Sequence, residues 1–263
     1  MVLPGDGAAV TFPWPDLMAE LAAAFDWRLA VAAIATAVAG VMRGFAGFGT
    51  AITLAPVYSV LWGPAVGVPT MLLLEAAIGS QLLFGAWRHV NRRVAFPMAG
   101  AACAMVPFGA WVLFVADPEW LTRAMGVLVI VFGAVLASGW RYRGSRPLPL
   151  TMAVGATAGL MKGSTGMSGP PVILYLLAGT EEAREHRANL ILFFAIIGIV
   201  ALLPPFIGGL FTASVLVKVA LLVPLMLLFV RVGAAMFGRV GQGSFRAVAY
   251  GILFVVGLIA LLA

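Results

Sequence analysis

Apolar residues follow one another along the chain in ten long runs, separated by short polar or glycine-rich stretches. A bilayer core of about 30 Å needs roughly 20 helical residues, so the length of each run indicates whether it can cross. Six runs reach that length: 65–87, 94–116, 120–140, 188–209, 213–236 and 245–262. The other four are shorter: 28–43 and 149–162 are borderline, and 50–62 and 169–179 are too short. A dozen residues at about 1.5 Å each span only about 18 Å, so the two shortest runs predict half-helices.

The chain also contains an internal repeat. Residues 39–47 (AGVMRGFAG) match residues 158–166 (AGLMKGSTG) at an offset of 119, and a cation is kept at Arg43 and Lys162. Two more glycine pairs agree at an offset of 124: Gly109 with Gly233, and Gly133 with Gly257. Each half therefore shows the order short, short, long, long, long.

This order predicts four parts of the chain: an interfacial lead-in at 1–27, a first membrane repeat at 28–140, a cytoplasmic linker at 141–148 and a second membrane repeat at 149–263. Arginine clusters at 88–93, 141–146 and 231–246 predict cytoplasmic loops, because basic loops stay inside. The acidic or uncharged loops at 117–123 and 204–214 then face outward, as do both termini. Run 65–87 goes inward and run 188–209 outward, so the halves are expected to be inverted copies. The loop 181–187, of mixed charge, must be cytoplasmic in this scheme.

Each repeat begins with two short runs that enter and return on the same side. One arrangement has two re-entrant hairpins, whose glycine-rich tips at 43–50 and 162–169 meet near the midplane. The other has 28–43 and 149–162 crossing fully and the next runs as tilted short spans. The predicted fold class is therefore an all-α polytopic membrane protein with two inverted repeats of about five segments, each starting with a broken or re-entrant helical hairpin.

Composition agrees with a membrane domain and excludes several other classes. Hydrophobic residues make up 63% of the 263 residues and charged residues 10%, against about 45–50% and about 25% in soluble domains. This excludes a soluble enzyme, a nucleic-acid-binding domain and a disordered chain. The single cysteine, Cys103, cannot form an internal disulfide, and His89 and His186 lack metal-ligand spacing. We therefore expect no metal and no cofactor, no nucleic-acid partner and no enzyme activity.

The paired cations are the strongest candidates for a site. A cation at the bilayer centre costs at least about 2.5–3.5 kcal/mol, so Arg43 and Lys162 beside flexible glycines suggest anion attraction. The alternative is that each side chain snorkels to an interface or complements the C-terminal dipole of its helix.

The two tips supply the rest of the candidate site. Glycines let the backbone approach a ligand, and a helix that begins at a tip points its amides at an anion. Pro170 and Pro171 lack N–H groups, so hydroxyls have to substitute at the second tip and the site is expected to be asymmetric. The expected binding residues are Arg43, Gly47, Gly49, Thr50, Lys162, Ser164, Thr165, Gly166, Ser168 and Gly169.

A few other residues have candidate roles beside the tips. Glu75 is the one acid inside a long apolar run, and it is either a proton carrier for coupling or a fixed partner of Arg43. Phe48 and Met167 are candidate gates or plain packing residues. Arg187 is a candidate gate at the inner vestibule or an anchor of the topology.

These motifs resemble those of the sulfite exporter TauE/SafE family of membrane transporters. The resemblance is carried by residues 43–49 (RGFAGFG) with 54–56 (LAP), by residues 159–172 (GLMKGSTGMSGPPV) and by residues 187–189 (RAN). It implies a protein of the bacterial inner membrane that moves sulfite, sulfonates or related small organic anions.

The expected function is accordingly secondary transport of a small anion, with sulfite or an organosulfonate as substrate. The anion would bind between the tips near the midplane, and alternating access would expose it to each side in turn. The expected partners are the anion, the lipid bilayer, H⁺ or Na⁺ as a coupling ion, and a second copy in a homodimer. Another small organic anion such as a carboxylate, a passive anion channel and a membrane assembly factor stay open as alternatives.

Overall fold

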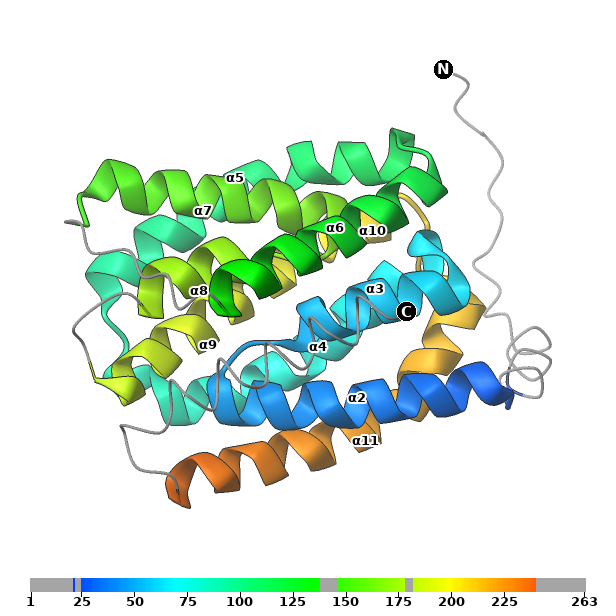
Figure 1. Ribbon diagram of the computed structural model, residues 1–263, viewed down its shortest axis with the longest axis horizontal. Helices are drawn as coiled ribbons and strands as arrows, with labels where there is room; N and C mark the ends of the chain where they lie inside the picture. Colours follow the sequence, from blue (N-terminus) through cyan, green and yellow to red (C-terminus); the bar gives the residue numbers. More distant parts are fainter. Residues whose placement is uncertain (1–20, 22–24, 138–145, 178–181, 240–263) are drawn as a thin grey trace, which may run out of the picture.

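The structure is a computed structural model of the chain, and it describes residues 21, 25–137, 146–177 and 182–239. Within these residues every element is a helix, and most helices run roughly along one direction (Figure 1). The predicted run 245–262, most of the lead-in 1–27 and most of the linker 141–148 lie outside the described residues.

The helices follow the predicted runs closely. In the first half they are α2 (Trp27–Ala46), α3 (Thr50–Trp62), α4 (Pro64–Ala86), the 3₁₀ turn η1 (Trp87–His89), α5 (Arg92–Val115) and α6 (Pro118–Ala137). In the second half they are α7 (Leu148–Thr165), α8 (Gly169–Leu177), α9 (Ala183–Val200), α10 (Leu203–Ile207) and α11 (Ala213–Arg239).

Two predicted runs differ from the helices observed. The run 188–209 is not one helix, because a turn at Ala201 and Leu202 separates α9 from α10. Pro204 and Pro205 follow this turn, and a proline disfavours helical backbone in the residue before it and supplies no N–H. The run 28–43 is longer than predicted, since α2 has 20 residues and spans about 30 Å.

Four stretches are long and apolar enough to cross a bilayer: Trp27–Ala46, Arg92–Val115, Arg184–Ile207 and Ala213–Phe237. A fifth is obtained when the two parts of the bent α4–η1 region are taken as one span. The chain is therefore a polytopic helical membrane protein, as its composition indicates.

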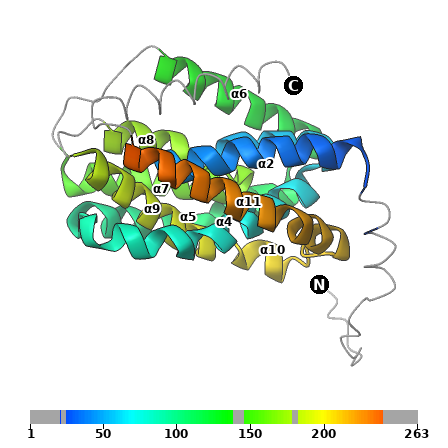
Figure 2. The ribbon, with the colours of Figure 1, turned by 90° about the horizontal axis from the view of Figure 1, so that it is seen from below.

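Glycines bring α2 and α11 into close contact, and both views show these helices side by side (Figures 1 and 2). A Cβ atom at Gly40 would lie 3.2 Å from the carbonyl oxygen of Met226, and one at Gly44 would lie 2.0 Å from that of Val230. Gly44 lies four residues after Gly40, and Val230 lies four residues after Met226. The two helices therefore run in the same direction.

The helices α5 and α7 repeat this arrangement. A Cβ at Gly155 would lie 2.2 Å from the carbonyl oxygen of Met98, and one at Gly159 would lie 2.1 Å from that of Ala102. This pair is also parallel, because Gly159 lies four residues after Gly155 and Ala102 lies four residues after Met98. Small residues let helix backbones approach in this way when no hydrophobic force drives association inside a membrane.

The glycine contacts of the two helix pairs are related by the offsets of the sequence repeat. Gly44 faces the carbonyl of Val230, and Gly163 faces the carbonyl of Val106. The two glycines are 119 residues apart and the two valines are 124 residues apart, which are the offsets of the repeat. Each parallel pair joins the first predicted run of one half of the chain to the fourth predicted run of the other half, so the two halves interleave.

Loops that the charge scheme places on one side lie at the same end of the bundle. The backbone N–H of Asn91 donates to Asn189 Oδ1 at 2.7 Å, and Asn91 Nδ2 donates to Glu185 Oε1 at 3.0 Å. The loop after α4 therefore contacts the start of α9. Segments at the predicted outer side also contact each other. A Cβ on Gly208 would lie 2.4 Å from the ring of Phe114, so the connection between α9 and α11 packs against the end of α5.

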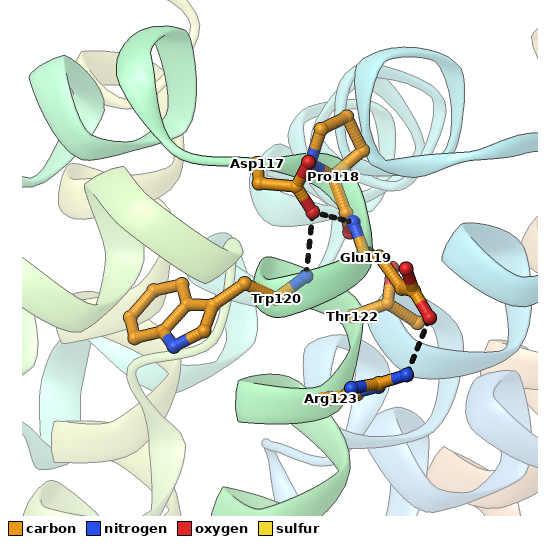
Figure 3. Close-up of polar contacts among 6 residues, drawn as sticks. All are labelled: Asp117, Pro118, Glu119, Trp120, Thr122 and Arg123. Carbon is orange, nitrogen blue, oxygen red and sulfur yellow. Dashed lines mark hydrogen bonds and ion pairs between the residues drawn. The ribbon is translucent and has the colours of Figure 1, made fainter.

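The turn between α5 and α6 is built around Asp117 (Figure 3). Asp117 Oδ1 accepts hydrogen bonds from the backbone N–H groups of Glu119 at 2.9 Å and Trp120 at 3.1 Å. An aspartate in this place satisfies free amides of the first helical turn. In the same first turn, Glu119 forms an exposed ion pair with Arg123, which lies one turn further along α6. This polar turn starts α6 after the break that ends α5.

Candidate functional site

The first tip joins α2 to α3 through two glycines with left-handed backbone. α2 ends at Gly47, with φ of 81°, and the Gly47 N–H donates to the carbonyl of Arg43 at 2.9 Å. Gly49 has φ of 110°, and a Cβ there would lie 2.8 Å from Met42 Cε. Only glycine adopts such backbone without strain, so the two glycines let the chain reverse and start α3 at Thr50.

The second tip repeats the first of these glycines 119 residues later, but Ser168 stands where the first tip has Gly49. α7 ends at Gly166, with φ of 74°, and its N–H donates to the carbonyl of Lys162 at 3.0 Å. α8 then begins at Gly169. Met167 and its counterpart Phe48 are each 1% exposed, so both candidate gate residues lie inside the protein.

The two tips pack against each other and against helices of the opposite repeat. A Cβ on Gly169 would lie 3.1 Å from Ile52 Cδ1, so the first turns of α8 and α3 are in contact. A Cβ on Gly166 would lie 2.5 Å from Met71 Cε in α4, and one on Gly47 would lie 3.1 Å from Ile191 Cγ1 in α9. The tips therefore meet in the interior, between α4 and α9.

Arg43 is buried at the end of α2 with part of its guanidinium unused. It is 1% exposed, which does not fit a side chain that snorkels to the headgroups. Its Nη1 donates to the Gly47 carbonyl at 2.8 Å, so it complements the C-terminus of its own helix. Its Cζ lies 5.1 Å from the centre of the Phe194 ring. Its Nε has no hydrogen-bond partner among the described residues.

Lys162 is also 1% exposed, but its charge is paired. Its Nζ forms an ion pair and hydrogen bond with Glu75 Oε2, and neither side chain is more than 4% exposed. The hydrogen-bonded partner of Glu75 is therefore Lys162. The predicted fixed partner, Arg43, was wrong. Arg43 contributes to the same field, because it interacts electrostatically with both members of the pair. The pairing places Glu75 beside the tips.

Two hydroxyls at the starts of the short helices lack partners. Thr50 and Ser168 are 0% exposed, and neither side-chain oxygen has a hydrogen-bond partner among the described residues. A buried polar group left unpaired costs about 1–3 kcal/mol. Together with Arg43 Nε, these hydroxyls form a set of buried polar groups at the two tips without hydrogen-bond partners among the described residues.

The other predicted hydroxyls are already used. Ser164 donates to the carbonyl of Leu160 at 2.9 Å, and Thr165 donates to that of Met161 at 2.8 Å. Thr165 Oγ1 also accepts from the N–H of Met167 at 3.3 Å. Both hydroxyls thus stabilise the end of α7, and the structure does not bring Ser164, which is partly exposed, into the group formed by Thr50 and Ser168.

Arg187 lies at the base of the first tip. Its Nε donates to the Phe45 carbonyl at 3.0 Å, its Nη2 donates to the Gly44 carbonyl at 2.6 Å, and its Cζ lies 4.6 Å from the Phe237 ring. It satisfies carbonyls of the last turn of α2, which have no partner inside the helix. This contact fixes α9 to the end of α2.

Sequence reasoning missed Phe194 and two hydroxyl pairs. Phe194 could have been found by extending the 119-residue offset, because it then matches Glu75. Thr36 Oγ1 lies 2.6 Å from the Tyr58 hydroxyl, and Thr151 Oγ1 lies 2.5 Å from the Tyr175 hydroxyl. Each pair ties the long helix of a hairpin to its short helix, and nothing local in the sequence indicates it.

Apolar helices long enough to span a bilayer define a polytopic membrane protein, and two buried cations lie near the ends of α2 and α7. The chain belongs to the sulfite exporter TauE/SafE family, whose family model matches residues 32–259. It is 28% identical over 220 residues to the "Probable sulfite/organosulfonate exporter TauE" of Cupriavidus necator, and the match covers 80% of this chain and 81% of that protein. None of the solved structures matches the chain.

Proposed function

We propose that this protein is a secondary transporter of small anions, with sulfite or an organosulfonate as its substrate. Membership of the TauE/SafE family and the name of the Cupriavidus necator relative support this substrate class. The observation that carries the proposal is a set of buried donors at the tips that lack partners in the part of the chain that the structure describes: Arg43 Nε and the hydroxyls of Thr50 and Ser168.

The chemistry of the tips suits an anion in several ways. Arg43 supplies charge, and its unused Nε is a donor for a sulfonate or sulfite oxygen. α3 and α8 begin at the two tips, and a helix N-terminus carries a partial positive charge and free amides, although Pro170 and Pro171 leave fewer amides at α8. Irregular backbone at membrane depth survives where protein or a water-filled cavity covers it, so a site at the tips is compatible with the bilayer.

Alternating access would use the interleaved packing of the repeats. The glycine contacts are closest within the pairs α2–α11 and α5–α7, so each pair is expected to move as a unit. We place the moving boundary between these two units, with the tips and helices α4 and α9 in the middle. The shared offsets of the two pairs support inverted repeats, and an inverted repeat lets the two units exchange roles between the two faces.

Phe48 and Met167 act as gates in this proposal, and Arg187 holds the tip of α2 against α9. Glu75 is the coupling group, because it is the acid beside both cations. A monoanion that leaves an inside-negative cell gains about 2.3 kcal/mol per 100 mV, so export needs no coupling ion. Uptake would require H⁺ or Na⁺. The proposal also places the protein in the inner membrane with both termini outside. Two copies form a homodimer.

Binding and flux of the purified protein test the function. Arg43→Gln removes the tip cation, and it should weaken binding of methanesulfonate and of sulfite at least tenfold, because a charge-assisted contact is lost. Arg88→Gln is the matched control, since Arg88 is an exposed arginine in η1. Equal binding by wild type, Arg43→Gln and Arg88→Gln would contradict the site.

Counterflow separates a transporter from a channel. Proteoliposomes loaded with unlabelled methanesulfonate should transiently accumulate labelled methanesulfonate above its outside concentration, because a carrier exchanges one anion for another. A passive pore shows no such accumulation. Flux without counterflow would therefore contradict alternating access and leave only anion conduction.

A further inference from the structure

One of the positions that differ between the two repeats places a different side chain beside each buried cation. Glu75 and Phe194 occupy equivalent places, in the matching stretches EAAIG and FAIIG, at the offset of 119 that also relates Arg43 to Lys162. The contacts cross between the repeats: Glu75 pairs with Lys162, whereas Phe194 presents its ring to Arg43. The same place in the fold therefore carries a carboxylate beside one cation and an aromatic ring beside the other.

This difference leaves Arg43 as a buried cation at the tips without a hydrogen-bonded carboxylate among the described residues. Glu75 neutralises Lys162, whereas the contacts of Arg43 are a carbonyl and a ring. The helix ends add partial charges of both signs and no full charge, because α2 and α7 end here and α3 and α8 begin here. Arg187 adds a positive charge at the edge, but it is partly exposed and held by two carbonyls of α2.

We propose that Glu75 sets the valence of the anion that the tips accept. With Glu75 ionised, the site favours a monoanion, such as an organosulfonate or bisulfite, over a dianion, such as sulfite ion or sulfate. Arg43 makes the direct contact, and Lys162 and Glu75 act through their charges. The inference rests on the proposed function and names the substrate class of the same site.

The isosteric anions methanesulfonate and sulfate test the valence directly, because they share a tetrahedral shape and differ in charge at neutral pH. Dissociation constants are measured by calorimetry on the purified full chain in detergent. Wild type should bind methanesulfonate more tightly. Glu75→Gln should shift the ratio of the two constants toward sulfate by about tenfold or more, because a second ligand charge no longer meets the carboxylate.

Phe194→Leu is the matched control at the equivalent place. It removes the ring beside Arg43 without changing any charge, so it should leave the ratio of the two dissociation constants unchanged even if both affinities fall. An unchanged ratio in Glu75→Gln, or an equal shift in Phe194→Leu, would overturn the inference.

A double variant covers the case in which Glu75→Gln does not fold because Lys162 is left buried and unpaired. Glu75→Gln with Lys162→Gln removes both charges and keeps the net charge of the tips, so its ratio should stay near that of wild type. A shift toward sulfate in the double variant would overturn the charge argument. Failure of wild type to bind methanesulfonate would overturn the proposed function as well, whereas binding with an unchanged ratio in Glu75→Gln overturns this inference alone.

Discussion

The parallel contact between α2 and α11 makes a quantitative prediction for Gly44. A Cβ atom at this position would lie 2.0 Å from the carbonyl oxygen of Val230 and 2.8 Å from the backbone nitrogen of Ala234. Both atoms belong to the backbone of α11, so no change of rotamer can relieve the contact. Because ordinary contact begins near 3.4 Å, the two helices must separate by more than about 1 Å to admit one methyl group.

The expected effect of Gly44→Ala follows from two opposing contributions. Overpacking costs about 1–3 kcal/mol, while alanine is better than glycine in a helix by roughly 0.5–1 kcal/mol. Gly44→Ala should therefore lower the free energy of unfolding by about 1–2 kcal/mol. Gly163→Ala should do the same, since a Cβ there would lie 2.2 Å from the carbonyl oxygen of Val106.

Gly100 in α5 provides the matched control. Apart from the neighbouring backbone of α5 itself, no atom of the described residues lies within 4 Å of a Cβ at Gly100, so Gly100→Ala should keep the helix-propensity gain of roughly 0.5–1 kcal/mol without any packing cost. Chemical unfolding of the three variants in the same detergent measures these differences. If Gly44→Ala proves as stable as Gly100→Ala, the close approach of α2 and α11 is wrong.

Three further predictions concern single contacts. Arg187→Gln should lower stability by about 1–3 kcal/mol because two carbonyls of α2 lose a charged donor, and unfolding should show no such loss for Arg184→Gln at an exposed position. Tyr58→Phe removes the hydroxyl bond between α3 and α2 and should cost about 0.5–1.5 kcal/mol, measured in the same way; a neutral result would argue against that bond. Asp117→Ala should cost about 1 kcal/mol through the lost cap of α6, whereas Arg123→Ala should change stability little because its ion pair is exposed; equal effects would contradict the capping role.

Much of the fold can be predicted from the sequence because its signals are local. The run 50–62 coincides with α3, and the starts of α8 and α11 match the predicted runs 169–179 and 213–236. Apolar length, glycine and proline act on the residues that carry them, so they mark where a helix begins and ends without reference to any other helix.

Partners across the fold could not be predicted in the same way. Glu75 meets Lys162, 87 residues away, and Arg187 meets the carbonyls of Phe45 and Gly44, which are 142 and 143 residues away. Such contacts depend on how α4 and α9 lie against the two hairpins. The repeat showed that two cations are equivalent, but not which of them Glu75 would neutralise.

Local chain chemistry therefore settles that this protein is a bundle of membrane helices with two glycine-rich tips and a cation at each. Tertiary packing decides that both cations are buried and that Lys162 carries the counter-ion, while Arg43 faces the ring of Phe194. The physical reason is the distance along the chain over which each interaction acts. Helix formation depends on residues within one or two turns. Charge compensation depends on which side chains, distant in sequence, the interleaved repeats bring within a few ångströms.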